Sequence, residues 1–178
     1  MHAIASRRGF LLGGTAMLAA CATSSKPTIP TTPTTPAASA TGVPLISDTA
    51  ARLDAAKARK LYEAGVRTVF RYYSHLPPSL VGKDLQPEEA KTIIGEGFSI
   101  GSVFQHYNNC FRTFENNWGR EDAEQALRQA EAAGQPEGSA IYFGVDADWP
   151  YQQLRDPILK YFDEVKRAFE GSGISVGI

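Results

Sequence analysis

Ser139–Val145 reads SAIYFGV, a nearly continuous apolar run with polar sequence on both sides. A strand that is buried on both faces of a sheet has this composition, because neither face meets water. The pattern before it, over 121–133, repeats alanine and leucine at helical spacing. The pattern after it opens with Asp156-Pro157, a helix cap and a favoured first residue, and continues as an apolar stripe over 158–169. The run is therefore predicted to be a central strand between two helices.

The same alternation of strand and helix patterns extends along the chain from residue 43. Strands are predicted at 43–47, 67–73, 99–105, 139–145 and 174–178, and helices at 51–64, 87–97, 121–133 and from 156 onward. Strands that alternate with helices build a parallel sheet, so the predicted fold class is α/β.

Two architectures fit this pattern, a (β/α)8 barrel and an open doubly wound sheet. No glycine-rich phosphate loop follows the first predicted strand, which counts against a nucleotide-binding open sheet. A barrel usually needs about 200 residues or more, and 42–178 is shorter than that. Because residue 178 falls inside a predicted strand, we expect a TIM-barrel-like fold truncated after about four and a half β/α units. Residues 42–178 are thus predicted to be the N-terminal part of a barrel domain.

The first residues of the chain carry export signals. Ser6–Leu11 reads SRRGFL, which is similar to the twin-arginine export motif, and the apolar stretch 10–20 after it is too short to span a bilayer. Leu18–Cys21 reads LAAC and resembles a lipobox, whose cysteine receives a lipid. Residues 1–21 are therefore predicted to be a twin-arginine lipoprotein signal peptide with Cys21 as the lipidated residue. The expected partners are the twin-arginine export machinery and the membrane, which would hold the exported protein in the cell envelope through its lipid anchor.

Residues 22–41 consist largely of alanine, threonine, serine and proline. Such a segment cannot bury a core, so it is predicted to be a disordered linker. At about 3.1 Å per residue its extended form would reach roughly 60 Å, which would hold a domain away from the membrane surface.

Composition limits the other partners. The formal net charge is −1 and no basic patch stands out, so nucleic acid is not expected as a partner. If Cys21 carries lipid, Cys110 has no disulfide partner and is expected to be a small buried residue, with metal ligation beside His106 as the alternative.

Polar and aromatic side chains gather where the predicted strands end, whereas the N-terminal ends of the strands carry no such cluster. In a barrel these C-terminal ends converge on one mouth, where barrel active sites lie. They carry Asp48, Arg71, Tyr72, Tyr73, Gln105, His106, Tyr107, Asp146, Asp148 and Trp149.

Asp146 and Asp148 are two residues apart, so on a strand both carboxylates would point to the same face. Crowded carboxylates raise each other's pKa, which suits a proton donor beside an ionised partner, as glycosidases require. The same Asp-x-Asp spacing also fits a loop that caps the next helix or binds a hydrated cation. The loop that begins at Tyr107 mixes aromatic residues with asparagines, which suits sugar rings as well as ordinary loop packing.

Four segments carry a family resemblance: Arg71-Tyr72-Tyr73-Ser74, Val103-Phe104-Gln105, Gly119-Arg120-Glu121-Asp122-Ala123 and Gly138–Asp148 (GSAIYFGVDAD). They resemble the glycoside-hydrolase-like domain catalogued as domain of unknown function 1906, which is similar to the lysozyme-type barrels of glycoside hydrolase family 25. The resemblance covers about 43–178 and implies a barrel, an extracytoplasmic setting and a cell-wall glycan substrate.

The resemblance also implies roles for three acids. Asp48 matches the acidic residue that ends the first strand, and Asp146 and Asp148 match the acidic pair that ends the fourth. Lysozyme-type barrels have glutamate, the acid, where this chain has Asp148, whose side chain is one methylene shorter.

We therefore predict an exported, lipid-anchored glycoside-hydrolase-like protein that acts on peptidoglycan or a related glycan. Asp148 would be the acid, with Asp146 and Asp48 as supporting carboxylates, and neither a metal nor a cofactor is expected. The predicted substrate-binding residues are Arg71, Tyr73, Gln105, His106, Tyr107 and Trp149. Two alternatives remain at this stage: a non-catalytic glycan-binding protein of the cell envelope, and a metal-assisted hydrolase that uses the same three aspartates.

Overall fold

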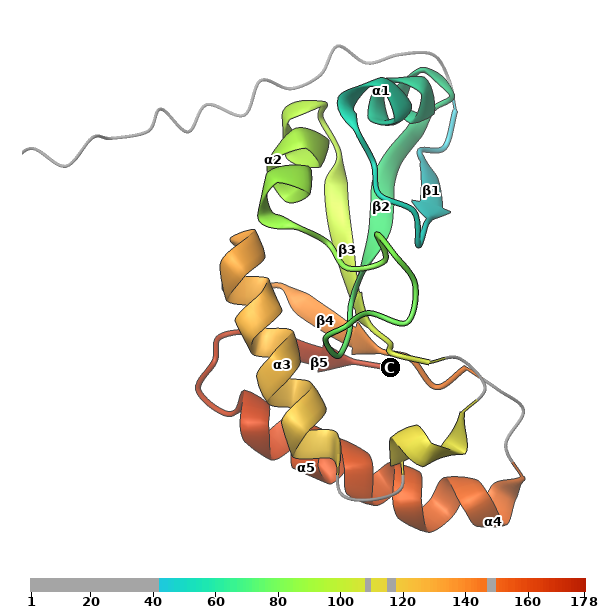
Figure 1. Ribbon diagram of the computed structural model, residues 1–178, viewed down its shortest axis with the longest axis vertical. Helices are drawn as coiled ribbons and strands as arrows, with labels where there is room; N and C mark the ends of the chain where they lie inside the picture. Colours follow the sequence, from blue (N-terminus) through green and yellow to red (C-terminus); the bar gives the residue numbers. More distant parts are fainter. Residues whose placement is uncertain (1–41, 108–109, 115–117, 147–149) are drawn as a thin grey trace, which may run out of the picture. The chain divides into compact units, whose positions relative to one another are not determined.

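The computed structural model describes residues 42–107, 110–114, 118–146 and 150–178. Strands and helices alternate along this part of the chain (Figure 1). The strands are β1 Leu45–Asp48, β2 Val66–Tyr73, β3 Ser99–Phe104, β4 Ala140–Phe143 and β5 Ser175–Gly177. The α-helices are α1 Ala55–Glu63, α2 Pro87–Gly95, α3 Trp118–Ala133, α4 Tyr151–Gln153 and α5 Leu159–Phe169. A 3-10 turn covers Phe111–Phe114, and a π-helical turn covers Leu154–Ile158 between α4 and α5.

The described strands form one five-stranded sheet in the order β1-β2-β3-β4-β5, and every neighbouring pair is parallel. The predicted α/β class with a parallel sheet is therefore confirmed. Neighbours in the sheet are also neighbours in the chain, whereas a doubly wound sheet reverses its order at a switch point. The carboxyl ends of consecutive strands consequently lie side by side, and the residues that follow them share one edge of the sheet.

Local signals account for the helix starts. Asp54 caps α1 by accepting a hydrogen bond of 2.9 Å from the amide of Lys57. Helix α2 begins at Pro87, whose missing amide hydrogen costs nothing in the first turn, and Glu88 and Glu89 lie near the positive end of the helix dipole.

The predicted start of the last helix at Asp156-Pro157 was wrong. Both residues lie inside the π-helical turn, and the regular helix α5 begins only at Leu159. Proline cannot donate to the carbonyl four residues earlier, so regular α-helical bonding is interrupted there. The predicted apolar stripe is nevertheless present, since Phe162, Val165 and Phe169 are buried.

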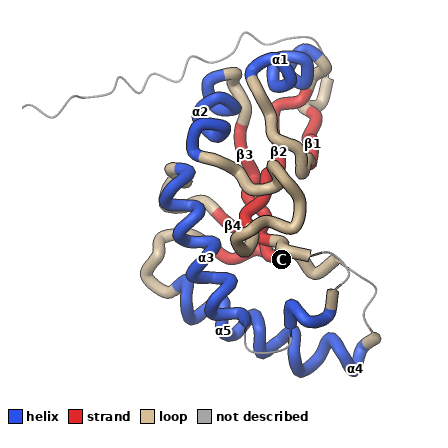
Figure 2. The backbone as a smooth tube through the Cα atoms, viewed as in Figure 1, coloured by secondary structure: helices blue, strands red, loops and turns tan. Residues whose placement is uncertain are grey.

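Helices α1, α2, α3 and α5 lie along one face of the sheet (Figures 1 and 2). The core lies between these helices and the sheet, and includes Val69, Phe104, Ile141 and Phe143 from the strands. Burial of β4 on both faces was predicted, but Tyr142 is 43% exposed between two buried neighbours. The reason is that Tyr142 points to the other face, over which the described residues place no helix.

On that second face aromatic rings lie against glycines of neighbouring strands. A methyl group added at Gly101 would come within 2.6 Å of the Phe70 ring, and one added at Gly177 would overlap the Tyr142 ring. The two rings meet edge to face with their centroids 6.2 Å apart. Glycine at these positions is therefore what allows the rings to lie down on the sheet.

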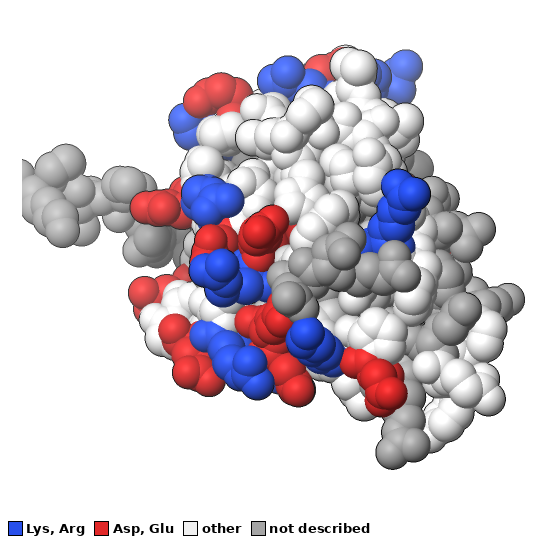
Figure 3. Space-filling model, turned by 60° about the horizontal axis from the view of Figure 1, so that its bottom comes forward, with Lys and Arg blue, Asp and Glu red and all other residues white. Residues whose placement is uncertain are grey.

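Two further properties of the described residues concern helix length and surface charge. Within the described residues, every helix falls short of the length and apolar character that a membrane crossing requires. On the face drawn in Figure 3, the described basic and acidic side chains are interspersed.

Candidate functional site

A polar cavity of about 460 Å³ lies at the carboxyl edge of the sheet. Its walls come from the end of β2 and from the segments that follow β1, β2, β3 and β4. The lining residues are Ala50, Tyr72, Ser79, Leu80, Lys83, Gln105, His106, Tyr107 and Asp146. Four segments that are far apart in the chain thus contribute to one cavity because the strands that precede them are parallel neighbours.

Asp48 lies next to Tyr72, which lines the cavity. The Tyr72 hydroxyl donates a hydrogen bond of 2.7 Å to the Asp48 carboxylate. Burial raises the pKa of Tyr72 to about 12, and the hydrogen bond to Asp48 and the negative charges of Asp48 and Asp146 act in the same direction. Both predicted carboxylates are therefore close enough to Tyr72 to act on its phenol.

Asp146 and Gln105 also line the cavity. The Gln105 side-chain amide donates a hydrogen bond of 3.2 Å to the Asp146 carboxylate, which is exposed. Strand β4 ends at Phe143, so Asp146 stands in the segment after the strand and not on it. The structure thus places Asp48, Gln105 and Asp146 near Tyr72, and their role as site residues stays a prediction.

Lys83 is a site residue that sequence reasoning missed. Only 4% of it is exposed, and its ammonium donates a hydrogen bond of 3.1 Å to the backbone carbonyl of His106. The same ammonium lies 5.0 Å from the centre of the Tyr72 ring, a cation–π contact. Burial lowers the pKa of Lys83. The loop 74–84 carried no sequence signal for this position, because a single lysine in a loop is normally on the surface.

His106 and Tyr107 complete the cavity wall. The Ser79 hydroxyl donates a hydrogen bond of 2.5 Å to the His106 carbonyl, so the loop after β2 holds His106 through both Ser79 and Lys83. The rings of His106 and Tyr107 are 4.1 Å apart, and Tyr107 is 51% exposed. Burial lowers the pKa of His106, and the nearby cationic side chains of His75 and Lys83 lower it further.

Arg71 and Tyr73 do not line the cavity, although both were predicted to bind substrate. Successive residues of a strand point to opposite faces, so these two share the helix-covered face while Tyr72 faces the site. The Tyr73 hydroxyl donates a hydrogen bond of 3.0 Å to Gln135, and Tyr73 is 1% exposed.

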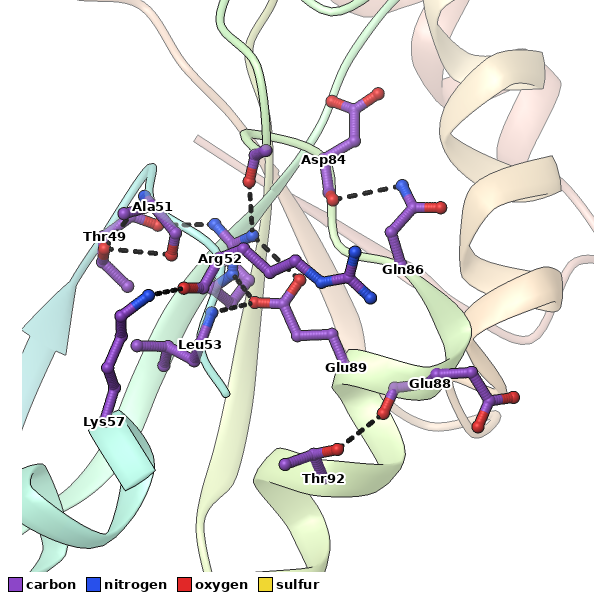
Figure 4. A network of polar contacts seen from close by, with 12 residues as sticks. Thr49, Ala51, Arg52, Leu53, Lys57, Asp84, Gln86, Glu88, Glu89 and Thr92 are labelled. Atoms are coloured by element: carbon purple, nitrogen blue, oxygen red, sulfur yellow. Dashed lines mark hydrogen bonds and ion pairs between the residues drawn. The ribbon is translucent and has the colours of Figure 1, made fainter. Parts of the chain in front are cut away.

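Arg71 is fully buried in an ion pair with Glu89 of α2. Its Nε lies 2.8 Å and its second guanidinium nitrogen 3.1 Å from the two Glu89 oxygens. Arg71 also donates to the carbonyls of Thr49 and Gly82, and Glu89 accepts the amide of Leu53, toward which its carboxylate points in Figure 4. The pair therefore ties the loops after β1 and β2 to α2, and these two loops contribute Ala50, Ser79, Leu80 and Lys83 to the cavity wall.

Asp148, Trp149 and Cys21 were predicted to be site residues and lie outside the described residues. Among the residues that are described, no group of three or more histidine, cysteine, aspartate or glutamate side chains is arranged to hold a metal ion. Cys110 is half-buried.

The sequence is similar to a family and to several curated proteins. Residues 59–178 match the family described as Rv2525c-like, glycoside hydrolase-like domain. FadG, an uncharacterized protein of Bacillus subtilis, is 31% identical over 74% of this chain and 23% of its own length. Rv2525c of Mycobacterium tuberculosis, named as a candidate peptidoglycan hydrolase, is 28% identical over 58% of this chain and 45% of its own length. The chain thus spans less than half of these relatives.

Solved structures share the fold. The Tat-secreted protein Rv2525c, crystallised in complex with HEPES, superposes with a TM-score of 0.59 at 23% identity, over 73% of this chain and 65% of that one. An uncharacterized protein of B. stearothermophilus gives a TM-score of 0.53 at 14% identity, over 72% and 56%. At these identities the likeness concerns the fold alone.

Proposed function

Because the chain belongs to the Rv2525c-like, glycoside hydrolase-like domain family, we propose that its polar cavity binds a cell-wall glycan and hydrolyses a glycosidic bond in it. The observation that carries the proposal is that Asp146 lines the cavity together with Tyr72, whose hydroxyl donates a hydrogen bond to Asp48, so that both carboxylates act on this phenol. A glycosidase needs two carboxyl groups, one as proton donor and one as base or nucleophile. Rv2525c, named as a candidate peptidoglycan hydrolase, supports peptidoglycan as the glycan.

The proposed division of labour follows the chemistry of each group. Asp48 and Asp146, which accept hydrogen bonds from Tyr72 and Gln105, would supply the base or nucleophile and stabilise positive charge on the sugar. Asp148 would be the proton donor, because it stands where the lysozyme-type barrels that the sequence resembles have their acid. Gln105 and Tyr107 would contact the sugar, with the exposed Tyr107 ring offering an apolar face to a pyranose, and Trp149 would add a second ring.

We also propose a setting for this activity. The consecutive, all-parallel strand order is that of a (β/α)8 barrel, so the whole domain would close into one. Rv2525c is a Tat-secreted protein, which supports the reading of Arg7-Arg8 as an export motif. Residues 1–21 would direct export, Cys21 would carry the lipid, and 22–41 would tether the domain. A Cys21→Ala precursor should then leave the membrane fraction, whereas an unmodified Cys21 in membrane-extracted protein would refute the lipid anchor.

The test is hydrolysis of purified peptidoglycan by the full-length protein, followed as release of reducing ends. Asp148→Asn keeps the size of the side chain but removes the proton, so the rate should fall by about 10²–10⁴ while glycan binding persists. Asp148→Glu restores the residue type of lysozyme-like barrels and should keep or raise the rate. The matched control is Asp163→Asn on the exposed side of α5, which should change neither.

Three outcomes would revise the proposal. An unchanged rate in Asp148→Asn would place the acid elsewhere. Binding without any release of reducing ends would favour a non-catalytic glycan-binding protein, a reading that the exposed Tyr107 ring also fits. Loss of the rate on adding a chelator would favour metal-assisted hydrolysis.

A further inference from the structure

A second polar cluster lies behind the His106 wall of the cavity. His75 follows β2, Asp122 belongs to α3 and Tyr161 belongs to α5. The His75 Nε2 forms an ion pair with Asp122 Oδ1, and the Tyr161 hydroxyl donates a hydrogen bond of 2.7 Å to Asp122 Oδ2. Asp122 is 1% exposed, and a carboxylate so deeply buried needs both partners.

The imidazoles of His75 and His106 are packed together. Their ring centroids are 5.3 Å apart and the rings are nearly perpendicular. Phe104 and Trp118 pack against other sides of His75, at 5.9 and 5.7 Å. One imidazole thus lines the cavity and the other lies between it and a buried acid. Two imidazolium ions at this separation would repel each other, so protonation of one ring disfavours protonation of the other.

The surrounding charges decide which ring takes that proton. His75 faces Asp122, with Glu121 nearby, and the hydrogen bond to Asp122 raises its pKa. His106 faces the Lys83 ammonium as well as His75, with Asp84 and Asp122 as more weakly acting acids, and burial lowers its pKa. The Nδ1 atom of His106 is buried without a hydrogen-bond partner among the described residues. His75 is therefore the ring that is protonated first.

We propose that His106, as a neutral imidazole with its hydrogen on the buried Nδ1, presents Nε2 to the cavity as a hydrogen-bond acceptor for a sugar hydroxyl, and that Asp122 keeps His106 neutral by holding the proton on His75. Asp122 and His75 are then positioning residues that never touch the glycan. This inference rests on the proposed glycan function of the cavity. It adds a pH limit, because glycan binding should weaken once acid protonates His106.

The first experiment measures the proton directly. The full chain has three histidines, His2, His75 and His106, so their imidazole NMR titrations can be assigned with His75→Gln and His106→Gln variants. In the wild type His75 should titrate above 6.5 and His106 below it. Asp122→Asn still accepts the Tyr161 hydroxyl but carries no charge, so the His75 midpoint should fall.

His75→Gln removes the neighbouring positive charge, so the His106 midpoint should rise in that variant. Glu124→Gln, on the exposed side of α3, is the control and should shift neither midpoint. Titration of His106 above His75 in the wild type would overturn the assignment of the proton.

The second experiment uses the disaccharide of N-acetylglucosamine and N-acetylmuramic acid as the probe and measures its affinity against pH. The acid limb of the binding curve should follow the His106 midpoint, move to higher pH in His75→Gln and vanish in His106→Gln. An acid limb that ignores the His106 midpoint would overturn the acceptor role while leaving the proposed function standing. No binding of the disaccharide at any pH would overturn both.

Discussion

The Tyr72 hydroxyl and the Asp48 carboxylate are joined by a hydrogen bond of 2.7 Å between β2 and the end of β1. A neutral residue in place of Asp48 removes the negative charge that strengthens the hydrogen bond from the phenol and repels a phenolate. Asp48→Asn should therefore lower the Tyr72 pKa from about 12, though not to its ordinary value, because burial is the larger cause and persists. Ultraviolet titration of phenolate absorbance, with Tyr72→Phe subtracted, measures the shift. An unchanged midpoint would mean that Asp48 does not act on the phenol in solution.

The buried pair of Arg71 and Glu89 predicts a large stability loss. Glu89→Gln leaves the guanidinium buried without its counter-charge, which should cost about 3–5 kcal/mol in unfolding free energy. Urea denaturation is the measurement. The matched control is Glu96→Gln, which removes the partner of the exposed Arg59 and should have no measurable effect, as for most surface pairs. Equal losses at the two positions would contradict this account.

The two histidines predict opposite pH effects on stability. The folded-state pKa of His75 is raised above 6.5, so its contribution is complete below 6.5 and is lost as pH rises through the folded value. The folded-state pKa of His106 is lowered, so its contribution is complete above 6.5 and is lost as pH falls through the folded value. His75→Gln should thus destabilise most at low pH, as measured by urea midpoints on both sides of 6.5. A penalty that grows with pH instead would reverse the assignment.

The ring that lies on Gly101 predicts that even a methyl group is too large there. Gly101→Ala would push against Phe70 and should destabilise the fold by about 1–3 kcal/mol, as overpacking does. Gly95→Ala is the control, since no atom lies within 4 Å of the added methyl group and alanine suits a helix better. Thermal melts should move in opposite directions for the two variants, and a neutral Gly101→Ala would show that the ring can move away.

The alternation of patterns predicted the element order because each element depends on its own residues. Strand and helix periodicities are local, and all the predicted strands are present. The ends were less exact: β4 was predicted over 139–145 and ends at Phe143. A strand ends where the backbone hydrogen bonds to its neighbouring strand end, and local composition does not record that point.

The site was predictable in part for the same reason. Asp48, Gln105 and Asp146 follow strand ends and lie near one another, whereas Arg71 and Tyr73 face the helices. The alternation of side chains along β2 carried that information, because Val69 points to the same face as Arg71 and Tyr73, and Phe70 points to the same face as Tyr72. Lys83 and the pairing of His75 with Asp122 depend on how a loop and a helix pack across the sheet, and nothing in their own neighbourhoods indicates it.

Arg71 donates hydrogen bonds to backbone carbonyls of two loops and forms its ion pair with Glu89 of α2. None of these contacts lies in the cavity. A mutational scan that scores only function would place Arg71 and Glu89 among the ligand contacts, because collapse of the loops would abolish binding as completely as loss of a contact. Scoring protein abundance in parallel would separate the two groups, since variants at Asp146 should accumulate normally and variants at Arg71 should be degraded.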